Sequence, residues 1–591
     1  MVGNSRQEAV DAQVVVVGGG VAGVCAAIAA ARNGATTVLV QDRPVLGGNS
    51  SSEIRVHVTG ADCSGGRPGF REGGILEEVR LEEATRNPHR NSCMWDLVLW
   101  EKVAAEPELR LLLNTVCDKA ETAMGHLVAV TARQLTTETE YRLAADYFID
   151  CTGHGRLGYL SAADYALGRE GPDEYGEPHA QGPDGKTMGA SLMWCARDVG
   201  HPVAFTPPSW ARSFTRPEDL PHRLGDSSLE YGHWWIEYGG ELDILHEGEK
   251  IRDELIACLM GVWDYYKNHS SMDAANWDLT WWGFLPGHRE SRRLLGPYVL
   301  TENDLLENRQ FEDGIGHGGW PIDTHPPAGI HSPDPPCHFL HAPEVYGIPL
   351  RILYSRNVPN LFMAGRDASC THMAMASTRV MGTCAVMGQA AGTAAAFCAR
   401  EGCLPSKLSA DQVSVIQQAL LRDDQYIPGL PGSDSADLAR RALVSASSHA
   451  LDCPPQAIQD GWTRKLERQS HQWRSAPGEA LPQHLELEWE EPVSVREVHL
   501  TFDTGFQRPL CLTNSEQFTA KMVRGPQPET VCDYDLEARV EGAWRPLLRE
   551  RGNYQRKRVH VAGVEGAQAL RLIVRATNGA PEARVFEVRV Y

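Results

Sequence analysis

The hydrophobic pattern is most regular near the N-terminus, where apolar runs alternate with small residues. Residues 14–17 are four consecutive valines, and a continuous apolar run of this kind is typical of a parallel strand buried on both faces. Three glycines follow, and residues 21–32 are rich in alanine, a strong helix former, up to Gly34. Residues 37–40 form a second apolar run. The pattern predicts a strand, a tight turn, a helix and a second strand.

The same pattern returns later in the chain. Short apolar runs at residues 110–113, 127–133 and 141–143 lead into a further strand at residues 147–151. Another strand begins at residue 361, and a helix of small residues is expected from about residue 378 to residue 399. We expect these segments to join the first ones, so that residues 12–155 and 356–425 form one α/β domain.

The other two regions have different patterns. Residues 156–355 are irregular and rich in tryptophan, histidine and proline, which predicts an inserted α+β domain that covers a substrate. A linker rich in glycine, proline and serine lies near residues 430–435. Beyond it, residues 436–591 alternate apolar and polar positions in short strands, which predicts an all-β sandwich of the jelly-roll type.

Composition narrows the class of protein. The 591 residues carry a formal charge of −21, which would repel nucleic acid and anionic membranes, so we expect neither as a partner. No run of about 18 apolar residues predicts a membrane helix. The 15 cysteines are scattered without a CxxC pair, which is typical of reduced thiols. Together with the lack of a visible signal peptide, this favours a cytoplasmic protein.

Residues 18–23, GGGVAG, form a GxGxxG motif between the first strand and the helix. Gly18 permits the tight turn, Gly20 lets the backbone approach a pyrophosphate, and Gly23 allows the helix to pack closely on the strand. The start of the helix then offers N–H groups and a positive dipole end to phosphate. A purely structural glycine turn is the competing interpretation. The complete strand–helix–strand context favours a Rossmann-type dinucleotide site, with Gln41 and Asp42 as the candidates for the ribose contact.

Three downstream features favour FAD over a nicotinamide cofactor. A glycine pair follows the second strand, a later strand ends at a small-residue turn, and a GRD turn precedes the helix of small residues. No second glycine fingerprint follows a strand, so we expect no built-in NAD(P)H domain and leave open whether electrons pass to oxygen, a quinone or a carrier protein. These features add Gly47, Gly48, Asn49, Thr152, Gly153, Gly365 and Asp367 to the expected cofactor site.

With these motifs the chain resembles the FAD-dependent oxidoreductases of the glutathione-reductase-like superfamily, which are related to fumarate-reductase-type flavoproteins. It is most similar to a bacterial family with segments like QDRPVLGGNSSSE and STRVMGTCAVMGQAAGTAAA, and the likeness covers roughly residues 12–425. The resemblance implies that Asp367 contacts the ribityl chain or pyrophosphate. It also implies that Gly382 and Thr383 lie near the flavin pyrimidine, and that the Val116 backbone meets the adenine. Arg55 is expected to line the flavin, and a covalent link at His57 is a further hypothesis.

The flavin carries the hydride chemistry, so the protein must supply binding, orientation and a proton acceptor. Histidine is the most frequent general base, and we favour His372 because it follows the GRD turn; a structural histidine is an equally weighted alternative. His325 is a second candidate, near His317 and Asp323. Two arginines, Arg379 and Arg293, are candidates for holding a substrate carboxylate or hydroxyl groups, or alternatively for structural ion pairs.

Two further groups of residues invite a ligand interpretation. The run His325, His331, Cys337, His338 and His341 fits no closed zinc pattern, so we expect no metal. Residues 436–591 resemble a discoidin-like, galactose-binding jelly roll, for which glycan binding and a packing or dimerising role are equally open.

Taken together, these features predict an FAD-dependent enzyme that dehydrogenates a polar hydroxylated small molecule, such as a sugar or glycoside. A second hypothesis is fumarate-reductase-like reduction of an activated double bond. A third, of another class, is a carbohydrate-binding protein with a vestigial flavin site. The sequence does not define the substrate, the electron acceptor or the oligomeric state, although a homo-oligomer is one option.

Overall fold

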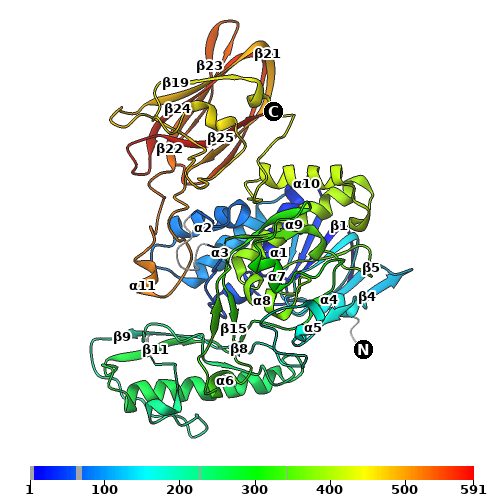
Figure 1. Ribbon diagram of the computed structural model, residues 1–591, viewed down its shortest axis with the longest axis vertical. Coiled ribbons are helices and arrows are strands. Elements are labelled where there is room, and N and C mark those ends of the chain that lie inside the picture. The colour runs from blue at the N-terminus through cyan, green and yellow to red at the C-terminus, as the bar shows by residue number, and fades with distance from the viewer. Residues whose placement is uncertain (1–5, 62–68, 225–227, 343) are drawn as a thin grey trace. The chain divides into compact units, whose positions relative to one another are not determined.

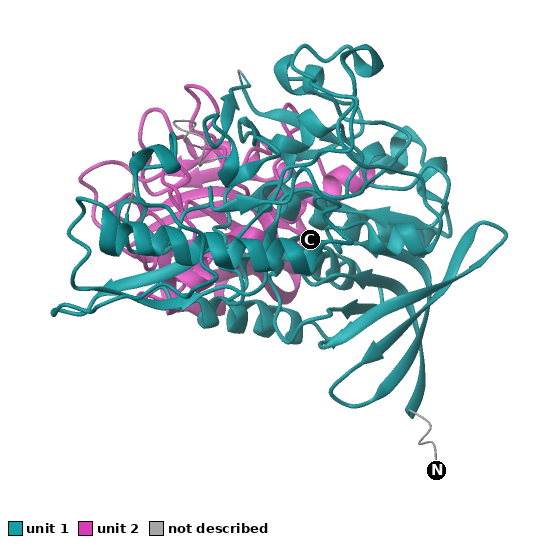
Figure 2. Cartoon of the chain, turned by 90° about the horizontal axis from the view of Figure 1, so that it is seen from below, with its two compact units in different colours: residues 1–64, 90–413, 512–519 teal, residues 65–89, 414–511, 520–591 magenta. Residues whose placement is uncertain are grey.

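The computed structural model describes residues 6–61, 69–224, 228–342 and 344–591, and the chain divides into two units by its internal contacts (Figure 2). Unit 1 comprises residues 1–64, 90–413 and 512–519, and unit 2 comprises residues 65–89, 414–511 and 520–591. These units group the chain differently from the predicted domains at residues 12–155 with 356–425, 156–355 and 436–591. Residues 65–89 belong with the C-terminal region, and residues 512–519 belong with the N-terminal one.

The centre of unit 1 is a seven-stranded sheet in the order β3-β2-β1-β6-β5-β4, with β18 also paired to β6. Strands β1, β2, β3, β6 and β18 are mutually parallel where they pair, whereas β4, β5 and β6 form an antiparallel meander. The four valines at residues 14–17 are buried at the end of β1, as a strand covered on both faces requires. The strands are β1 (Arg6–Val17), β2 (Thr37–Val40), β3 (Leu109–Leu112), β4 (Thr115–Ala123), β5 (His126–Gln134), β6 (Thr139–Asp150) and β18 (Leu361–Met363).

Two helices of small residues pack directly on each other beside this sheet. They are α1 (Val21–Arg32) and α9 (Met381–Glu401), and both are seen near the centre of Figure 1. A Cβ added to Gly388 would lie 2.1 Å from the Ala22 carbonyl oxygen, and one on Gly392 would lie 2.0 Å from that of Ala26. The glycines of α9 therefore permit the close approach of the two backbones.

The predicted helix over residues 378–399 is present as α9, and a further helix that was not predicted lies before it. A short helix α8 (His372–Thr378) precedes α9, and the two axes differ by 94°. Arg379 and Val380 lie at the break between them. No single helix among the described residues has the length and apolar character of a membrane span. Helices α8 and α9 reach that length and apolar character only when the two parts of the bent pair are counted together.

The inserted region is α+β, as predicted. Its main helix, α6 (Gly248–Asp264), packs with the antiparallel pair of β9 (Trp194–Asp198) and β11 (Trp277–Trp282) in one hydrophobic core (Figure 1). The other elements are short: β7 (Tyr165–Ala166), β8 (Ala190–Ser191), β10 (Glu237–Tyr238), β12 (Gly287–His288), β13 (Arg293–Leu294), β14 (Gly314–Gly318), β15 (Ile322–Thr324), β16 (His338–Leu340), β17 (Tyr346–Pro349), α4 (Arg156–Leu160), α5 (Pro172–Tyr175) and α7 (Glu302–Leu306).

The main part of unit 2 is the β-sandwich that the alternating strands of residues 436–591 predict. Its antiparallel sheet has the order β20-β25-β21-β24-β22-β23, with β19 paired to β21, and Trp473, Phe502 and Tyr534 lie in its core. Helix α2 (Gly74–Arg86) belongs to this unit because buried Glu77 accepts a hydrogen bond of 2.8 Å from the Thr504 hydroxyl. The strands are β19 (Leu443–Ala446), β20 (Trp473–Arg474), β21 (Gln483–Phe502), β22 (Val531–Val540), β23 (Ala543–Glu550), β24 (Lys557–Thr577) and β25 (Arg584–Val590).

Candidate functional site

The turn between β1 and α1 has the geometry of a phosphate-binding loop. Gly18 has a φ of 104°, and a Cβ there would lie 2.3 Å from the Cys151 carbonyl oxygen. A Cβ on Gly23 would lie 1.8 Å from the Gly18 carbonyl oxygen. By contrast, a Cβ on Gly20 would meet nothing nearer than the Gly48 Cα at 4.0 Å. The space therefore opens at the N-terminus of α1, where no side chain caps the helix and the N–H groups can bind an anion.

The second glycine pair lies beside this loop. Gly47 pairs with Gly20 in a parallel bridge, and its N–H donates to the Gly19 carbonyl at 2.8 Å. Gly47 has a φ of 101° and Gly48 a φ of 58°, conformations that favour glycine. The Asn49 side chain donates to the His288 carbonyl oxygen at 2.9 Å. The structure therefore brings residues 47–49 to the phosphate loop. The Asn49 side chain holds this segment to the backbone of His288.

The two ribose candidates differ in their surroundings. The Gln41 side-chain oxygen accepts from the Gly19 N–H at 2.7 Å, and its amino group donates to the Val45 carbonyl at 3.1 Å. Because both ends of this buried amide bind the backbone, Gln41 holds the loop in place, and we no longer expect it to contact a ribose. The side chain of Asp42 is 64% exposed, so the prediction of a ribose contact rests on Asp42.

Basic groups gather around the turn at the end of β6. A Cβ on Gly153 would lie 2.5 Å from Arg366 Nη2, so this glycine makes room for the guanidinium. Arg366 Nη1 has no hydrogen-bond partner among the described residues. Burial lowers the pKa of His288 to about 3, with further lowering by Arg366 and Arg43. Arg43 is paired with Glu53 at 3.3 Å, whereas Arg366 keeps an unused donor, so Arg366 is the cation available to the negative charges of a dinucleotide pyrophosphate.

Asp367 lies next to Arg366 and is fully buried. Neither of its side-chain oxygens has a hydrogen-bond partner in the described chain. Burial, with the nearby Asp150 carboxylate, raises the pKa of Asp367 well above its usual value. Asp150 itself accepts from the Thr152 N–H at 2.9 Å and the Thr152 hydroxyl at 2.7 Å. A buried carboxyl without partners is costly, and the hydroxyl groups of a ribityl chain would satisfy it, so the residues present fit FAD.

The remaining predicted cofactor residues are spread around the same unit. Thr383 is fully buried in the first turn of α9, and its hydroxyl has no partner among the described residues, whereas the Gly382 N–H donates to the Thr59 carbonyl at 2.7 Å. The Arg55 guanidinium lies 3.9 Å from the centre of the Trp281 ring. Val116 lies on β4 opposite Arg133, and its contact with adenine stays a prediction.

A buried charge network surrounds His372 and Arg293, two of the predicted catalytic residues. The His372 Nδ1 atom lies 2.9 Å from Glu290 Oε2, and its backbone N–H donates to Glu170 at 2.8 Å. Arg293 is fully buried and donates to Glu290, to Glu170 at 2.7 Å, and to two main-chain carbonyls. Because every nitrogen of the guanidinium donates within the protein, Arg293 cannot also hold a substrate, and its predicted catalytic role is replaced by a structural one. We call these four residues the closed network.

A second buried network surrounds His325 and Arg379. His325 Nδ1 lies 2.7 Å from Glu237 Oε2, and its Nε2 lies 3.3 Å from Asp323 Oδ1 and 3.1 Å from Arg379 Nη2. Arg379 Nη2 also donates to Asp323 Oδ2 at 3.0 Å, and Arg289 lies 3.4 Å from Glu237. Burial opposes ionisation of Asp323, yet His325 and the two arginines hold its pKa at about 2. We call these five residues the open network.

The open network retains unused hydrogen-bonding capacity. Arg379 Nε and Glu237 Oε1 are buried without a hydrogen-bond partner among the described residues, as is Trp320 Nε1 in the same region. In the closed network no fully buried side-chain atom is left in this state, although His372 Nε2, on a side chain that is 8% exposed, makes no hydrogen bond among the described residues. Arg379 ends α8 directly before α9, so the open network lies at the helix start that the resemblance assigns to the flavin pyrimidine. Among the predicted catalytic residues, His325 and Arg379 are therefore brought together, and His372 and Arg293 form a separate network.

Sequence reasoning missed a contribution from the C-terminal region. Residues 512–519, including the short helix α11 (Glu516–Thr519), belong to unit 1. The Thr513 hydroxyl lies 3.3 Å from His57 Nδ1, and the Asn514 amide donates to Cys195 at 3.2 Å. A pocket is lined by Ser50, Arg55, Val56, Val58, Ser92, Trp95, Leu512, Thr513 and Asn514. The only sequence signal for this segment is the long interruption of the strand pattern between residues 502 and 531.

Comparison with known proteins gives one match over most of the chain. The model of a family described as FAD dependent oxidoreductase matches residues 13–420. No curated protein matches the chain. Among solved structures, the family 32 carbohydrate-binding module of NanJ from C. perfringens, in complex with galactose, is 14% identical, covers 26% of this chain and 94% of its own, and has a TM-score of 0.19. The corresponding module of EndoD from Streptococcus pneumoniae is 18% identical, covers 26% of this chain and 99% of its own, and has a TM-score of 0.21.

Proposed function

Because this chain belongs to the family of FAD dependent oxidoreductases, we propose that it dehydrogenates an alcohol group of a polar, hydroxylated small molecule of the sugar or glycoside class. Bound FAD supplies the hydride acceptor for such a reaction. The protein must then take up the hydroxyl proton and hold the substrate. The observation that carries the proposal is the open network, where a buried histidine is paired with a carboxylate and flanked by an arginine with an unused N–H.

His325 is the proposed proton acceptor. Because Nδ1 is held by Glu237 at 2.7 Å, Nε2 is the nitrogen proposed to take up the proton, and the substrate hydroxyl would replace Arg379 Nη2, which lies 3.1 Å from it. Asp323 lies 3.3 Å from Nε2 and stabilises the protonated ring. Glu237 fixes the orientation and tautomer of the imidazole, as a carboxylate does in other histidine bases. This assignment replaces His372, our first choice from the sequence.

Arg379 and Trp234 are proposed to orient the substrate. Arg379 keeps an unused Nε–H that can donate to a hydroxyl or alkoxide oxygen. The ring of Trp234 meets that of His325 edge-on, with ring centres 5.2 Å apart, and the residue is 36% exposed. An aromatic ring that is partly exposed beside a base supports a substrate with an apolar ring face as well as hydroxyl groups.

An anaerobic substrate screen tests this proposal. The holoenzyme is mixed without oxygen with common sugars and glycosides while the absorbance of the oxidised flavin is followed. We expect bleaching with at least one of them, and slower bleaching in His325→Gln than in the matched variant His372→Gln. If no sugar or glycoside bleaches the flavin, and an enoate instead reoxidises the dithionite-reduced enzyme, the proposal is wrong and double-bond reduction takes its place. In that reaction Arg379, and not Arg293, would bind the carboxylate of the substrate.

A further inference from the structure

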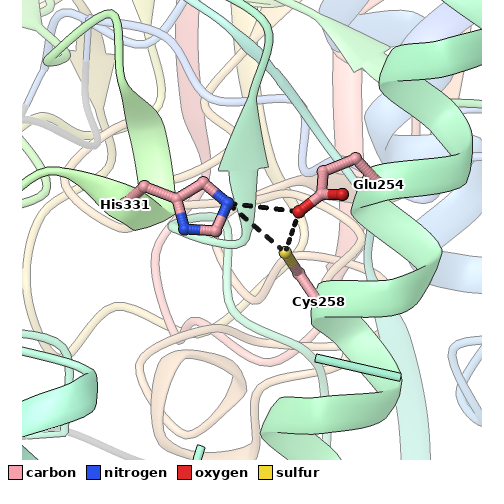
Figure 3. Close-up of side chains that lie close together, drawn as sticks. All are labelled: Glu254, Cys258 and His331. Atoms are coloured by element: carbon pink, nitrogen blue, oxygen red, sulfur yellow. Dashed lines mark hydrogen bonds and ion pairs between the residues drawn. The ribbon is translucent and has the colours of Figure 1, made fainter. Parts of the chain in front are cut away.

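Three potential metal ligands from distant parts of the inserted region point at one another (Figure 3). Glu254 and Cys258 lie one turn apart on α6, and His331 lies on the 3-10 helix η4 (Gly329–His331). Among the described residues, this is one group of His, Cys, Asp or Glu whose ligand atoms all lie within 4.8 Å of one another. It shares only His331 with the run of histidines and cysteine considered from the sequence.

From this arrangement we propose a zinc site formed by Glu254, Cys258 and His331. His331 Nε2 lies 3.2 Å from Glu254 Oε1, Cys258 Sγ lies 3.6 Å from the same oxygen, and Cys258 Sγ lies 4.0 Å from His331 Nε2. Tetrahedral zinc, with bonds of about 2.0 Å to N or O and about 2.3 Å to S, places such atoms about 3.3–3.5 Å apart. The three atoms therefore need to move by only a few tenths of an ångström around an ion.

The surroundings leave room for a fourth ligand. The His331 side chain is 42% exposed, Glu254 is 14% exposed, and Cys258 is fully buried. Thus the cluster has one side that faces solvent, from which a water molecule can complete the coordination. The ligand set, with one thiolate, one imidazole and one carboxylate, suits zinc better than the oxygen-seeking magnesium or calcium ions.

Arg212 competes with the proposed ion for Glu254. Its Nε donates to Glu254 Oε1 at 2.7 Å, and its second nitrogen binds the other carboxylate oxygen. The Arg212 side chain is 55% exposed, so it can move away from Oε1 and keep its bond to Oε2. Arg212 therefore weakens the site without blocking it, and its removal should strengthen metal binding.

A metal ion bound at this site would link η4 to α6 through His331 and the two α6 ligands. The chain reaches η4 four residues after His325, and a Cβ on Gly329 would lie 2.1 Å from the Glu237 carbonyl oxygen. Thus η4 packs against β10, which carries Glu237 of the open network. A bound ion would stabilise this part of the inserted region, and the proposal does not depend on which substrate the enzyme oxidises.

Metal titration of the full-length, untagged holoenzyme tests the site. After removal of metals with a chelator, the protein is titrated with Zn²⁺ by calorimetry and with Co²⁺ by absorbance. We expect a single equivalent of Zn²⁺, and a thiolate-to-Co²⁺ charge-transfer band that requires Cys258. Proton release from the thiol should accompany binding, so the observed heat should depend on the buffer.

Variants distinguish the proposed site from other metal binding. Cys258→Ser and His331→Ala should each weaken Zn²⁺ binding by more than about 100-fold and abolish the Co²⁺ band. His246→Ala, which removes a histidine whose side chain is 77% exposed, should bind as the unmodified protein does. Arg212→Gln should bind Zn²⁺ about tenfold more tightly, since it frees Oε1 and removes a repelling charge.

Two results would overturn the proposal. One is wild-type protein that binds no stoichiometric Zn²⁺ and gives no charge-transfer band. The other is Zn²⁺ binding that His331→Ala leaves unchanged; because this side chain is partly exposed, the variant should fold even if the buried Cys258→Ser does not. Loss of flavin bleaching by sugars would leave these titrations unaffected, so the two proposals fail separately.

Discussion

The closed and open networks contain the same kinds of side chains and differ in how completely those side chains are paired. The closed network joins one histidine, one arginine and two glutamates, and all guanidinium nitrogens of Arg293 donate within it or to main-chain carbonyls. The open network has two arginines, two carboxylates and His325, yet Arg379 Nε and Glu237 Oε1 are left over among the described residues.

This difference separates structural from functional residues better than residue type does. Buried polar atoms are normally paired, since an unpaired one costs about 1–3 kcal/mol. In the closed network every fully buried atom is paired, and only His372 Nε2 makes no hydrogen bond among the described residues. The open network has unpaired buried atoms at the start of α9, where a cofactor is expected, and a bound ligand can pair with them. On this basis His325 replaces His372 as the proposed base.

The largest expected effect is on catalysis by His325. The variant His325→Gln should lower kcat/KM for the bleaching substrate by about 10²–10⁴-fold, the usual contribution of a general base. In His372→Gln the loss should be about tenfold at most, because glutamine keeps a donor for Glu290. Stopped-flow measurement of anaerobic flavin reduction gives both numbers. An equal loss in the two variants, or a greater one in His372→Gln, would remove the distinction between the networks.

The free energy of unfolding should depend more on the closed network than on the open network. Replacing Arg293 by methionine leaves Glu290 and Glu170 buried without their cation, and should cost about 3–5 kcal/mol in the free energy of unfolding. Arg379→Met should cost less than half as much, because Asp323 keeps His325 and lies near Arg289. Denaturant unfolding of both variants, followed by tryptophan fluorescence, measures the pair. A larger loss for Arg379→Met would mean that the open network is the structural one.

The pH dependence of stability should differ between Asp323 of the open network and Asp367 of the expected cofactor site. The pKa of Asp323 is lowered to about 2 from 3.8, so its ionised form stabilises the fold above the ordinary pKa, and this stability is lost as pH falls towards 2. It amounts to about 2 kcal/mol near neutral pH. The pKa of Asp367 is raised instead, so its contribution falls as pH rises above its ordinary value.

Asparagine variants test these opposite signs. In flavin-free protein, Asp323→Asn should lower stability at pH 7 and flatten its dependence between about pH 4 and pH 2. Asp367→Asn should raise stability at pH 7, while FAD is retained less tightly. Unfolding midpoints across pH, with and without added FAD, give the measurement. If both variants shift stability in the same direction at pH 7, the assigned charge states are wrong.

The sequence predicts those features that depend on local backbone requirements. At Gly18 and Gly23 a Cβ would collide with a main-chain oxygen, so these positions require glycine. The spacing of the GxGxxG motif predicts this requirement directly. The roles of His325 and His372 depend instead on Glu237 and Glu290, which lie 88 and 82 residues away in the sequence. No local pattern shows which of two distant carboxylates is already paired. For the same reason no local pattern shows that the Gln41 amide binds the backbone of Gly19 and Val45.

The smallest effect is expected where the C-terminal chain enters unit 1. Thr513→Val keeps the shape of the side chain but removes the hydroxyl that lies 3.3 Å from His57. If the pocket at Thr513 admits part of the substrate, KM should rise about three- to tenfold with kcat unchanged, which is the value of one hydrogen bond. Gln517→Ala, at an exposed position of the same segment, is the matched control and should change neither constant. A fall in kcat with KM constant would instead place Thr513 among the groups that position the reacting atoms, because only a contact stronger in the transition state than in the bound substrate changes kcat.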